Sequence, residues 1–353
     1  MSDSAVDRLF DSILGAFDVL TIALGDRLGL YDVLHAHGPI TAPALAEHAG
    51  IDPRYAREWV EQQCVAGWVG VDDPGAAADE RRYSLTPDAA ETLRDRDSED
   101  YLAAITQIVA AAAAQLPALA EAYRTGGGVP WAQYGPAMRR GQADGNRPLY
   151  LGSMTRAWLP SLPELHERLR AGTRVADIGC GDGWGSIAIA RAYPDVTVDG
   201  YDVDPDSIAA AQANARDSGV ADRATFHQVD ATRPPQVQEY GLVTAFECIH
   251  DLPDPVSVLA GMRGMAQPDG WVLVMDERVP DAFTGPGDDV ERLMYGYSTL
   301  ICLPDAMAHR PTRATGTVMR LDVLRRYAQE AGFVDVEVLP IEHDVFRLYR
   351  LLS

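Results

Sequence analysis

One stretch of the sequence has residue types and a spacing that suit ligand binding, Asp177-Ile-Gly-Cys-Gly-Asp-Gly183. It begins inside a short apolar run, Val175 to Ile178, which has the pattern of a buried strand. The three glycines allow the backbone to turn tightly and to approach a ligand closely, because no Cβ stands in the way. We expect a helix from Gly185 to Tyr193. A strand, a glycine turn and a helix in this order form the nucleotide site of doubly wound α/β sheets.

Acidic residues also follow the next two predicted strands. The second strand, Val196 to Asp202, ends in an acid about 20 residues after the glycine turn, where a carboxylate would bind ribose hydroxyls. The third strand, Thr225 to Val229, is followed by Asp230. Helix capping would explain any one of these acids but not an acid after each of three successive strands. The Gly-x-Gly-x-Gly spacing, preceded by an acid, also differs from the Gly-x-Gly-x-x-Gly pattern of NAD sites.

From Glu164 to Ser353, these motifs resemble those of the class I S-adenosylmethionine (SAM) dependent methyltransferases. The resemblance implies an α/β fold with a Rossmann-like seven-stranded sheet that ends in an antiparallel hairpin. It also implies SAM as cofactor and S-adenosylhomocysteine as product. The residues that would bind the methionine part, the ribose and the adenine of the cofactor are Asp177, Gly179, Cys180, Gly181, Gly183, Asp202, Val203, Asp230, Ala231 and Glu247.

The remainder of this domain is expected to alternate strands and helices. The fourth strand is predicted at Leu242 to Ile249, and two final strands at Phe333 to Glu342 and Val345 to Leu351. A long insertion, residues 281–318, separates the fifth strand from the last helix. We expect a helix at its start and irregular chain from Cys302 to Thr317. A segment of this length within a compact domain is typical of a lid or a pocket wall.

Residues 1–95 have the pattern of a winged-helix domain. Val6 to Leu24 carries apolar residues at helical spacing, and Asp52-Pro53 begins the candidate recognition helix. That helix contains Arg54 and Arg57, but acidic residues offset both. The family resemblance implies that this module, with its N-terminal helices, forms a homodimer and closes one side of the substrate pocket.

Residues 96–163 are interpreted as a helical linker with a substrate flap. Glu99 to Arg124 is predicted to be helical, whereas Val129 to Leu149 is rich in turn-forming residues. This second segment either folds over the substrate or packs between the domains. The residues expected to line the substrate pocket are Trp131, Tyr134, Met154, His250 and Met294.

His250 is the candidate general base, because the unperturbed pKa of a histidine lies near neutrality. It follows the fourth strand, and His250-Asp251 resembles the His-Asp pair of plant-type and polyketide-type O-methyltransferases. In that family the histidine takes the proton of a phenol, and a carboxylate on the next strand orients it. Glu277 is in about the matching place. A structural role for His250 in the loop is the alternative.

Composition limits the classes of partner. The net charge is -22 and the chain contains no lysine, so a cationic surface for nucleic acid or for an acidic membrane is not expected. No apolar stretch of about 18 residues and no signal peptide are visible, which predicts a cytoplasmic protein. The four cysteines are far apart, His35 and His37 have no third ligand nearby, and we predict no metal.

These features predict a SAM-dependent methyltransferase that acts on a small, partly apolar acceptor, at oxygen rather than at nitrogen or carbon. The alternative is a SAM-binding regulator or scaffold that uses the winged helix and has no catalytic activity.

Overall fold

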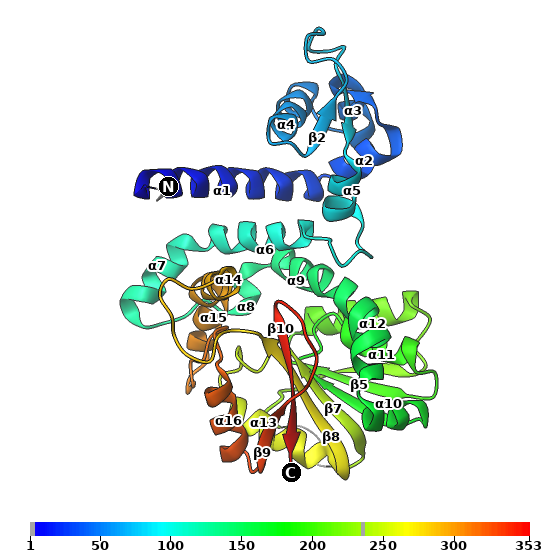
Figure 1. The fold of residues 1–353 in the computed structure, drawn as a ribbon, viewed down its shortest axis with the longest axis vertical. Coiled ribbons are helices and arrows are strands. Elements are labelled where there is room, and N and C mark those ends of the chain that lie inside the picture. Colours follow the sequence, from blue (N-terminus) through cyan, green and yellow to red (C-terminus); the bar gives the residue numbers. More distant parts are fainter. Residues whose placement is uncertain (1–3, 234–236) are drawn as a thin grey trace. The chain divides into compact units, whose positions relative to one another are not determined.

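The computed structural model describes residues 4–233 and 237–353. Two compact units make up the chain, and each is described by itself. The N-terminal unit contains Met1–Ala113 and Pro136–Pro148, and the C-terminal unit contains Ala114–Gly135 and Leu149–Ser353 (Figure 1).

The N-terminal unit is mainly helical, with a small three-stranded sheet in the order β1-β3-β2. Its elements are α1 (Ala5–Arg27), α2 (Leu30–His37), β1 (Ile40–Thr41), α3 (Ala42–Ala49), α4 (Pro53–Val65), β2 (Val69–Val71), β3 (Arg82–Leu85), α5 (Pro87–Arg94), α6 (Ala103–Ala114) and α9 (Pro136–Leu149). Local sequence determines where several helices begin. Ser4 forms a capping box with Asp7, and Asp52 accepts hydrogen bonds from the first turn of α4, which Pro53 opens.

The core of this unit lies between the short helices and the sheet. Leu30, Leu34 and Leu45 are fully buried there, and the Tyr31 hydroxyl donates to the buried Gln63 side chain at 2.7 Å. Helix α1 differs from its neighbours, because almost all of its large apolar side chains are exposed. Those side chains have exposed fractions of 43% to 76%: Val6, Leu9, Phe10, Ile13, Leu14, Phe17, Leu20 and Leu24.

The C-terminal unit alternates strands and helices after an initial helical segment. That segment contains α7 (Leu116–Thr125), α8 (Trp131–Tyr134), the π-helix η1 (Tyr150–Trp158), the 3₁₀-helix η2 (Leu159–Ser161) and α10 (Pro163–Arg170). The alternating part contains β4 (Arg174–Ile178), α11 (Trp184–Ala192), β5 (Thr197–Asp202), α12 (Pro205–Asp217), β6 (Ala224–Gln228), β7 (Tyr240–Phe246), α13 (Pro255–Met265) and β8 (Ala266–Glu277). The insertion and the C-terminal part contain α14 (Asp289–Tyr297), the π-helix η3 (Ser298–Cys302), α15 (Leu303–Ala308), α16 (Leu321–Glu330), β9 (Asp335–Val338) and β10 (Phe346–Leu352).

The seven strands form one sheet in the order β6-β5-β4-β7-β8-β10-β9. Strands β4 to β8 are parallel, and β10 runs antiparallel to both β8 and β9. The expected seven-stranded α/β sheet with a terminal antiparallel pair is therefore confirmed. Helices α10, α11 and α12 cover one face and α13 and α16 the other, each over its own buried apolar cluster (Figure 1). The order reverses beside β4, which places the glycine turn at the topological switch point of the sheet.

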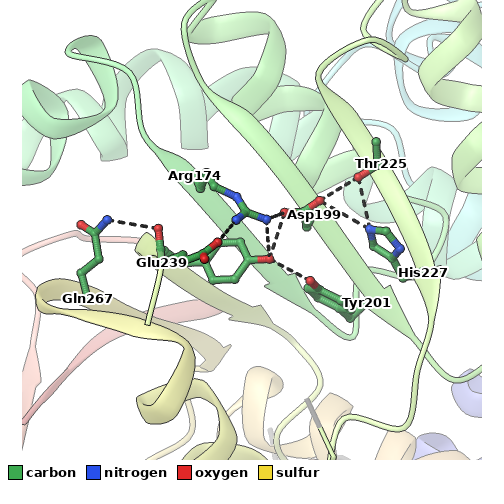
Figure 2. Close-up of polar contacts among 8 residues, drawn as sticks. Arg174, Asp199, Tyr201, Thr225, His227, Glu239 and Gln267 are labelled. Atoms are coloured by element: carbon green, nitrogen blue, oxygen red, sulfur yellow. Dashed lines mark hydrogen bonds and ion pairs between the residues drawn. The ribbon is translucent and has the colours of Figure 1, made fainter. Parts of the chain in front are cut away.

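A polar network joins four parallel strands near their amino ends (Figure 2). The Asp199 carboxylate on β5 accepts hydrogen bonds from Arg174 on β4 at 2.8 Å, from Thr225 on β6 at 2.7 Å and from Tyr240 on β7 at 2.9 Å. The Tyr240 hydroxyl also lies 2.8 Å from that of Tyr201. Burial raises the pKa of Asp199, but the hydrogen bonds outweigh it and hold the pKa below its usual range. The network therefore stabilises the strands in their paired register.

Two predicted segments differ from the structure. Residues 129–149, expected to be turn-rich, contain α8 and α9, which are separated at Gly135. Residues 302–317, expected to be irregular, begin with α15. In both segments proline stands at a helix start, where its missing N–H is harmless, so it opens a helix instead of marking a turn. The two compact units also divide the predicted linker 96–163, since 136–148 belongs to the N-terminal unit and 114–135 to the C-terminal unit.

Within the described residues, no single helix is long and apolar enough to cross a membrane. The bent pair formed by α6 and α7 meets that test of length and composition only when the two helices are taken together.

Candidate active site

The glycine turn after β4 has the open, tightly turned backbone that the sequence predicted. Gly179, Gly181 and Gly183 all have positive φ angles, of 68°, 51° and 82°. A Cβ at Gly183 would lie 2.8 Å from the Phe226 ring, and one at Gly179 would lie 2.7 Å from the Cys248 sulfur. No atom lies within 4 Å of a Cβ placed on Gly181. The first and third glycines therefore permit close packing, whereas the middle one faces open space.

Asp202, at the end of β5, is joined directly to this turn. One carboxylate oxygen accepts from the Gly181 N–H at 2.9 Å, and the other accepts from the Asp204 N–H at 2.9 Å. Burial raises the pKa of Asp202 above its ordinary value. Each oxygen has a second lone pair, so both can still accept a hydrogen bond from a ligand. Val203 follows with 67% of its surface exposed, which offers an apolar platform beside the carboxylate.

Asp177, at the end of β4, is buried on the same edge of the sheet. Its carboxylate accepts hydrogen bonds from the Ser186 hydroxyl at 2.7 Å and from the Thr244 hydroxyl at 2.8 Å. Burial, with a smaller contribution from Asp202, raises the pKa of Asp177 to about 6. Ser186 and Thr244 were not singled out from the sequence, because nothing in their local pattern distinguishes them from ordinary helix and strand residues.

The remaining predicted cofactor residues have different surroundings. Burial raises the pKa of the Cys180 thiol well above its ordinary value, so this residue is a neutral part of the turn. Asp230 is exposed, and its carboxylate accepts from the N–H and the hydroxyl of Thr232 at 2.9 Å and 2.8 Å, with the half-buried Ala231 between them. These hydrogen bonds lower the pKa of Asp230. Asp230 therefore orders its own turn, and its predicted contact with adenine stays a prediction.

Glu247 follows β7 in an unusual backbone conformation, with a φ of 53°. Positive φ is uncommon for residues other than glycine and tends to occur at functional sites. Its carboxylate accepts from the Tyr150 hydroxyl at 3.2 Å. Tyr150 begins η1, a π-helical segment interrupted by the irregular Gly152. This pairing could not be predicted from the sequence, because the two residues are far apart along the chain.

His250, three residues after Glu247 in the sequence, lies in a cluster of carboxylates. Its Nδ1 is 2.9 Å from an Asp276 oxygen, in hydrogen-bond geometry, and 3.1 Å from a Glu277 oxygen. Its Nε2 is 3.2 Å from Asp251 Oδ1. The predicted proximity of His250 and Glu277 is thus present, but the hydrogen bond to Nδ1 is made by the neighbouring Asp276. Adjacent strand residues normally point to opposite faces, yet at this strand end the carboxylates of both Asp276 and Glu277 reach His250.

The carboxylates determine the charge of this cluster. Burial lowers the pKa of His250, but Asp251, Asp276 and Glu277 outweigh it and raise the pKa well above the ordinary value. Burial raises the pKa of Glu277 well above its usual range. For Asp276 the effect of burial is outweighed by His250 and by hydrogen bonds, so its pKa is lowered. Glu277 is therefore the protonated carboxyl, and Asp276 is the charged partner of the ring.

The predicted flap and the insertion are bound to each other within the C-terminal unit. The Tyr134 hydroxyl donates to the Leu300 carbonyl at 2.6 Å, and the Trp131 N–H donates to Asp305 at 2.7 Å. Burial and, to a smaller extent, the neighbouring charge of Asp251 together raise the pKa of Asp305 to about 6. This influence of Asp251 indicates that α15 approaches the His250 cluster.

The two predicted pocket methionines are buried, in different surroundings. Met154 belongs to the apolar cluster beneath α11, which already accounts for its burial. Met294 is buried in α14, one turn after Glu291. A lining role for either residue stays a prediction.

A separate cavity among the described residues lies away from these groups. His166, Tyr193 and Asp195 line it, and they precede β4 and β5 at the amino ends of the strands. Ligands of open α/β sheets bind at the opposite, carboxyl edge.

The carboxyl edge fits a SAM molecule on three grounds. The space over Gly181 is open, Asp202 has lone pairs free for ribose hydroxyls, and the exposed Val203 offers an apolar surface to an adenine ring. The acids at Asp177 and Glu247 also suit the positive charges of the methionine part of SAM.

Two parts of the chain match known protein families. Residues 169–303 match a family described as a methyltransferase domain, and residues 16–95 match the Rv2258c-like winged HTH domain.

Similarity to curated proteins covers mainly the methyltransferase part. The ubiquinone biosynthesis O-methyltransferase of Nitrosospira multiformis is 34% identical over 188 residues, which cover 53% of this chain and 73% of that protein. The enzyme of the same name from Bordetella avium is 37% identical over 102 residues, which cover 29% of this chain and 42% of the relative. The chain therefore spans less than half the length of that relative.

Among solved structures, human N-acetylserotonin methyltransferase in complex with SAM has the same fold over the whole chain. Its TM-score is 0.73 at 17% identity, with 100% of this chain and 99% of that chain covered. The sheet order, the glycine turn with its acids and the identity with the Nitrosospira multiformis protein together assign the family. The chain belongs to the class I S-adenosylmethionine-dependent methyltransferases and carries an N-terminal winged-helix domain.

Proposed function

We propose that this protein methylates a hydroxyl oxygen of a small, partly apolar acceptor. The observation that carries this proposal is the position of the His250 cluster directly after β7, beside the strand ends that carry Asp177 and Asp202. Bound SAM would supply an electrophilic methyl group on its sulfonium. The relatives named O-methyltransferase support oxygen as the methylated atom.

In this proposal the protein positions the methyl-accepting molecule and supplies a group that takes its proton. The acceptor oxygen attacks the methyl carbon in line with the breaking carbon–sulfur bond, whose electron pair stays on sulfur. Because the surrounding carboxylates raise the pKa of His250, the ring first releases its Nε2 proton to solvent, and the hydroxyl proton then passes to Nε2. Asp276 holds the Nδ1–H, which leaves the Nε2 lone pair on the side of Asp251. The surrounding carboxylates stabilise the imidazolium that forms, and Glu277 helps to position the ring.

The test uses purified protein, SAM and a panel of small phenols and hydroxylated aromatic compounds. Formation of S-adenosylhomocysteine together with an acceptor heavier by one methyl group is the expected result. With a productive acceptor, His250→Ala should reduce kcat by about 10²–10⁴-fold, the usual contribution of a general base. A loss below about tenfold would mean that proximity alone drives the transfer. Glu121→Gln, at an exposed position on α7, serves as the matched control.

Contacts of the candidate recognition helix argue against the alternative, a SAM-binding regulator that contacts DNA. On α4, Arg54 pairs with Glu58 and Arg57 pairs with Asp79 at 3.2 Å, so both cations already have acidic partners. Specific retardation of DNA fragments by the purified protein would reverse this preference.

We also propose that α1 mediates homodimer formation. Its exposed apolar side chains recur every three or four residues along α1, an arrangement typical of an interaction surface, and a second copy would present the same stripe. Phe10→Glu with Phe17→Glu should convert a dimer to a monomer in sedimentation velocity experiments, with SAM binding retained. A wild-type monomer at micromolar concentration would contradict the proposal. A cytoplasmic location stays a prediction.

A further inference from the structure

Three different kinds of metal-binding atom lie together on the Nε2 side of the His250 ring. One ligand atom from each of His250, Asp251 and Cys302 lies within 4.8 Å of the other two, and His250 Nε2 lies 3.2 Å from Asp251 Oδ1. His250 and Cys302 are buried, whereas 34% of the Asp251 side chain is exposed, which gives solvent access to the group from one side. We propose that these three residues form a binding site for a divalent transition-metal cation such as Zn²⁺.

The spacing agrees with such a site. Zinc lies about 2.0–2.3 Å from nitrogen, oxygen and sulfur ligands in tetrahedral geometry, which places neighbouring ligand atoms about 3.3–3.7 Å apart. Nε2 and Asp251 Oδ1 are 3.2 Å apart, so they need little movement to share one cation. A nitrogen, a carboxylate oxygen and a thiolate together favour zinc or cobalt over magnesium or calcium.

Buried carboxylate oxygens provide independent support. Asp251 Oδ1 is buried and accepts no hydrogen bond, despite its closeness to Nε2. Asp276 and Glu277 on the other side of the ring are both more than nine-tenths buried, and their oxygens lie 2.9 Å and 3.1 Å from Nδ1. Excess carboxylate oxygen around one imidazole favours an additional positive charge at this position.

The contact of Nδ1 with Asp276 determines which ring nitrogen would bind the metal. Asp276 accepts from Nδ1 at 2.9 Å, so the proton of a neutral ring lies there and the Nε2 lone pair faces Asp251 and Cys302. A carboxylate that holds the second nitrogen of a metal-binding histidine in this way is a common arrangement, and its loss usually lowers metal affinity about 10–100-fold. Asp276 would thus orient the ligand without touching the cation.

Contacts within the C-terminal unit hold the segment that supplies Cys302. Tyr134 binds the Leu300 carbonyl, Tyr123 donates to the Thr299 carbonyl at 2.9 Å, and the Val129 N–H donates to the Pro304 carbonyl at 2.9 Å. The sulfur is therefore placed by the surrounding structure. On binding, the Cys302 thiol and the Nε2–H of the charged His250 ring would each release a proton to solvent, and the thiolate and Asp251 would neutralise the two charges of the cation.

The consequence for catalysis rests on the proposed function. The Nε2 lone pair that would accept the hydroxyl proton is the one that would bind the metal, so the cation would compete with methyl transfer. Zn²⁺ should inhibit reversibly, and a chelator should restore the rate.

Cobalt binding tests the site without reference to methyl transfer. The metal-free full-length protein is titrated with Co²⁺, and we expect one equivalent to give the near-ultraviolet charge-transfer absorption of a thiolate–cobalt bond. Cys302→Ser should remove this absorption and weaken binding by about tenfold or more. Cys64→Ser, which changes a free cysteine of the N-terminal unit, should retain both the absorption and the Co²⁺ affinity of the wild type. Binding without the thiolate absorption, for example at the stacked His37 and His48 rings, would overturn the proposal, as would absorption that survives in Cys302→Ser.

A second variant distinguishes loss of the metal site from a folding defect. Asp251→Asn changes a partly exposed side chain and should also weaken Co²⁺ binding by about tenfold or more, while a thermal melt and S-adenosylhomocysteine binding report an intact fold. Wild-type Co²⁺ affinity in folded Asp251→Asn would contradict the assignment. If no acceptor is ever methylated but the cobalt results hold, the proposed function fails and the metal site stands.

Discussion

The two ends of strands β4 and β5 carry acids in opposite physical states. Near the amino end of β5, Asp199 accepts hydrogen bonds from Arg174, Thr225 and Tyr240, and its pKa is lowered (Figure 2). Three residues later, at the carboxyl end, burial raises the pKa of Asp202. Asp177, at the matching end of β4, has a pKa of about 6.

This contrast separates a structural cluster from a binding edge. A carboxylate with a lowered pKa stabilises the fold, whereas one with a raised pKa costs stability when it is ionised. Natural sequences keep such costly groups mainly where a ligand uses them. The amino ends therefore hold the sheet together, and the carboxyl ends are prepared for the cofactor.

The largest expected effect on stability is at the glycine turn. Gly183→Ala should lower the free energy of unfolding by about 2–5 kcal/mol, since a positive φ costs about 1–2 kcal/mol and overpacking against Phe226 adds about 1–3 kcal/mol. Gly181→Ala meets no neighbour, so it should cost only the backbone strain but weaken SAM binding through its Cβ. Urea denaturation and calorimetric titration measure the two effects. Equal stability losses with unchanged SAM affinity would show that Gly181 does not face the ligand.

The second largest effect on stability is expected from removal of Asp199, the structural acid. Asp199→Ala leaves Arg174, Thr225 and Tyr240 without their shared acceptor, and we expect about 2–3 kcal/mol less stability in urea denaturation. SAM affinity should remain within about twofold of the wild type, because the change is at the opposite strand end. A large loss of SAM affinity with preserved stability would reverse the roles assigned to the two ends.

A smaller effect is expected from pH. The folded-state pKa of Asp177 is about 6, against about 3.9 in an unfolded chain, so the native state binds more protons between these values. The contribution of this carboxyl to stability is therefore greatest at low pH and is lost as pH rises through about 6. The free energy of unfolding should therefore lose about 1.4 kcal/mol of this contribution between pH 5 and pH 7.

The Asp177 effect is read as the difference between the wild type and Asp177→Asn, which removes the titrating group and keeps its shape. Unfolding free energies at pH 5 and pH 7 provide the measurement. If the wild-type protein and Asp177→Asn respond equally to pH, the raised pKa of Asp177 is refuted.

The sequence predicted the sheet and the binding edge because their signals are local. Alternating apolar strands, a glycine turn and acids at strand ends each occupy a few consecutive residues, as for Asp177 and Asp202. The pairing of Tyr150 with Glu247 and the approach of Cys302 to His250 join distant segments, and no local pattern encodes them. The prediction missed α8, α9 and α15, which are short or proline-containing helices with Pro130, Pro136 and Pro304 at their starts.

The central claim is that Asp202 at the carboxyl edge holds the cofactor and that the acid at the other end of the strand does not. Calorimetric titration of S-adenosylhomocysteine into folded Asp202→Asn and Asp199→Asn tests it most directly. We expect Asp202→Asn to bind at least about 100-fold more weakly, since two hydrogen bonds to a charged acceptor are worth about 1.5–3 kcal/mol each, and Asp199→Asn to bind like the wild type. Wild-type affinity in Asp202→Asn would contradict the account.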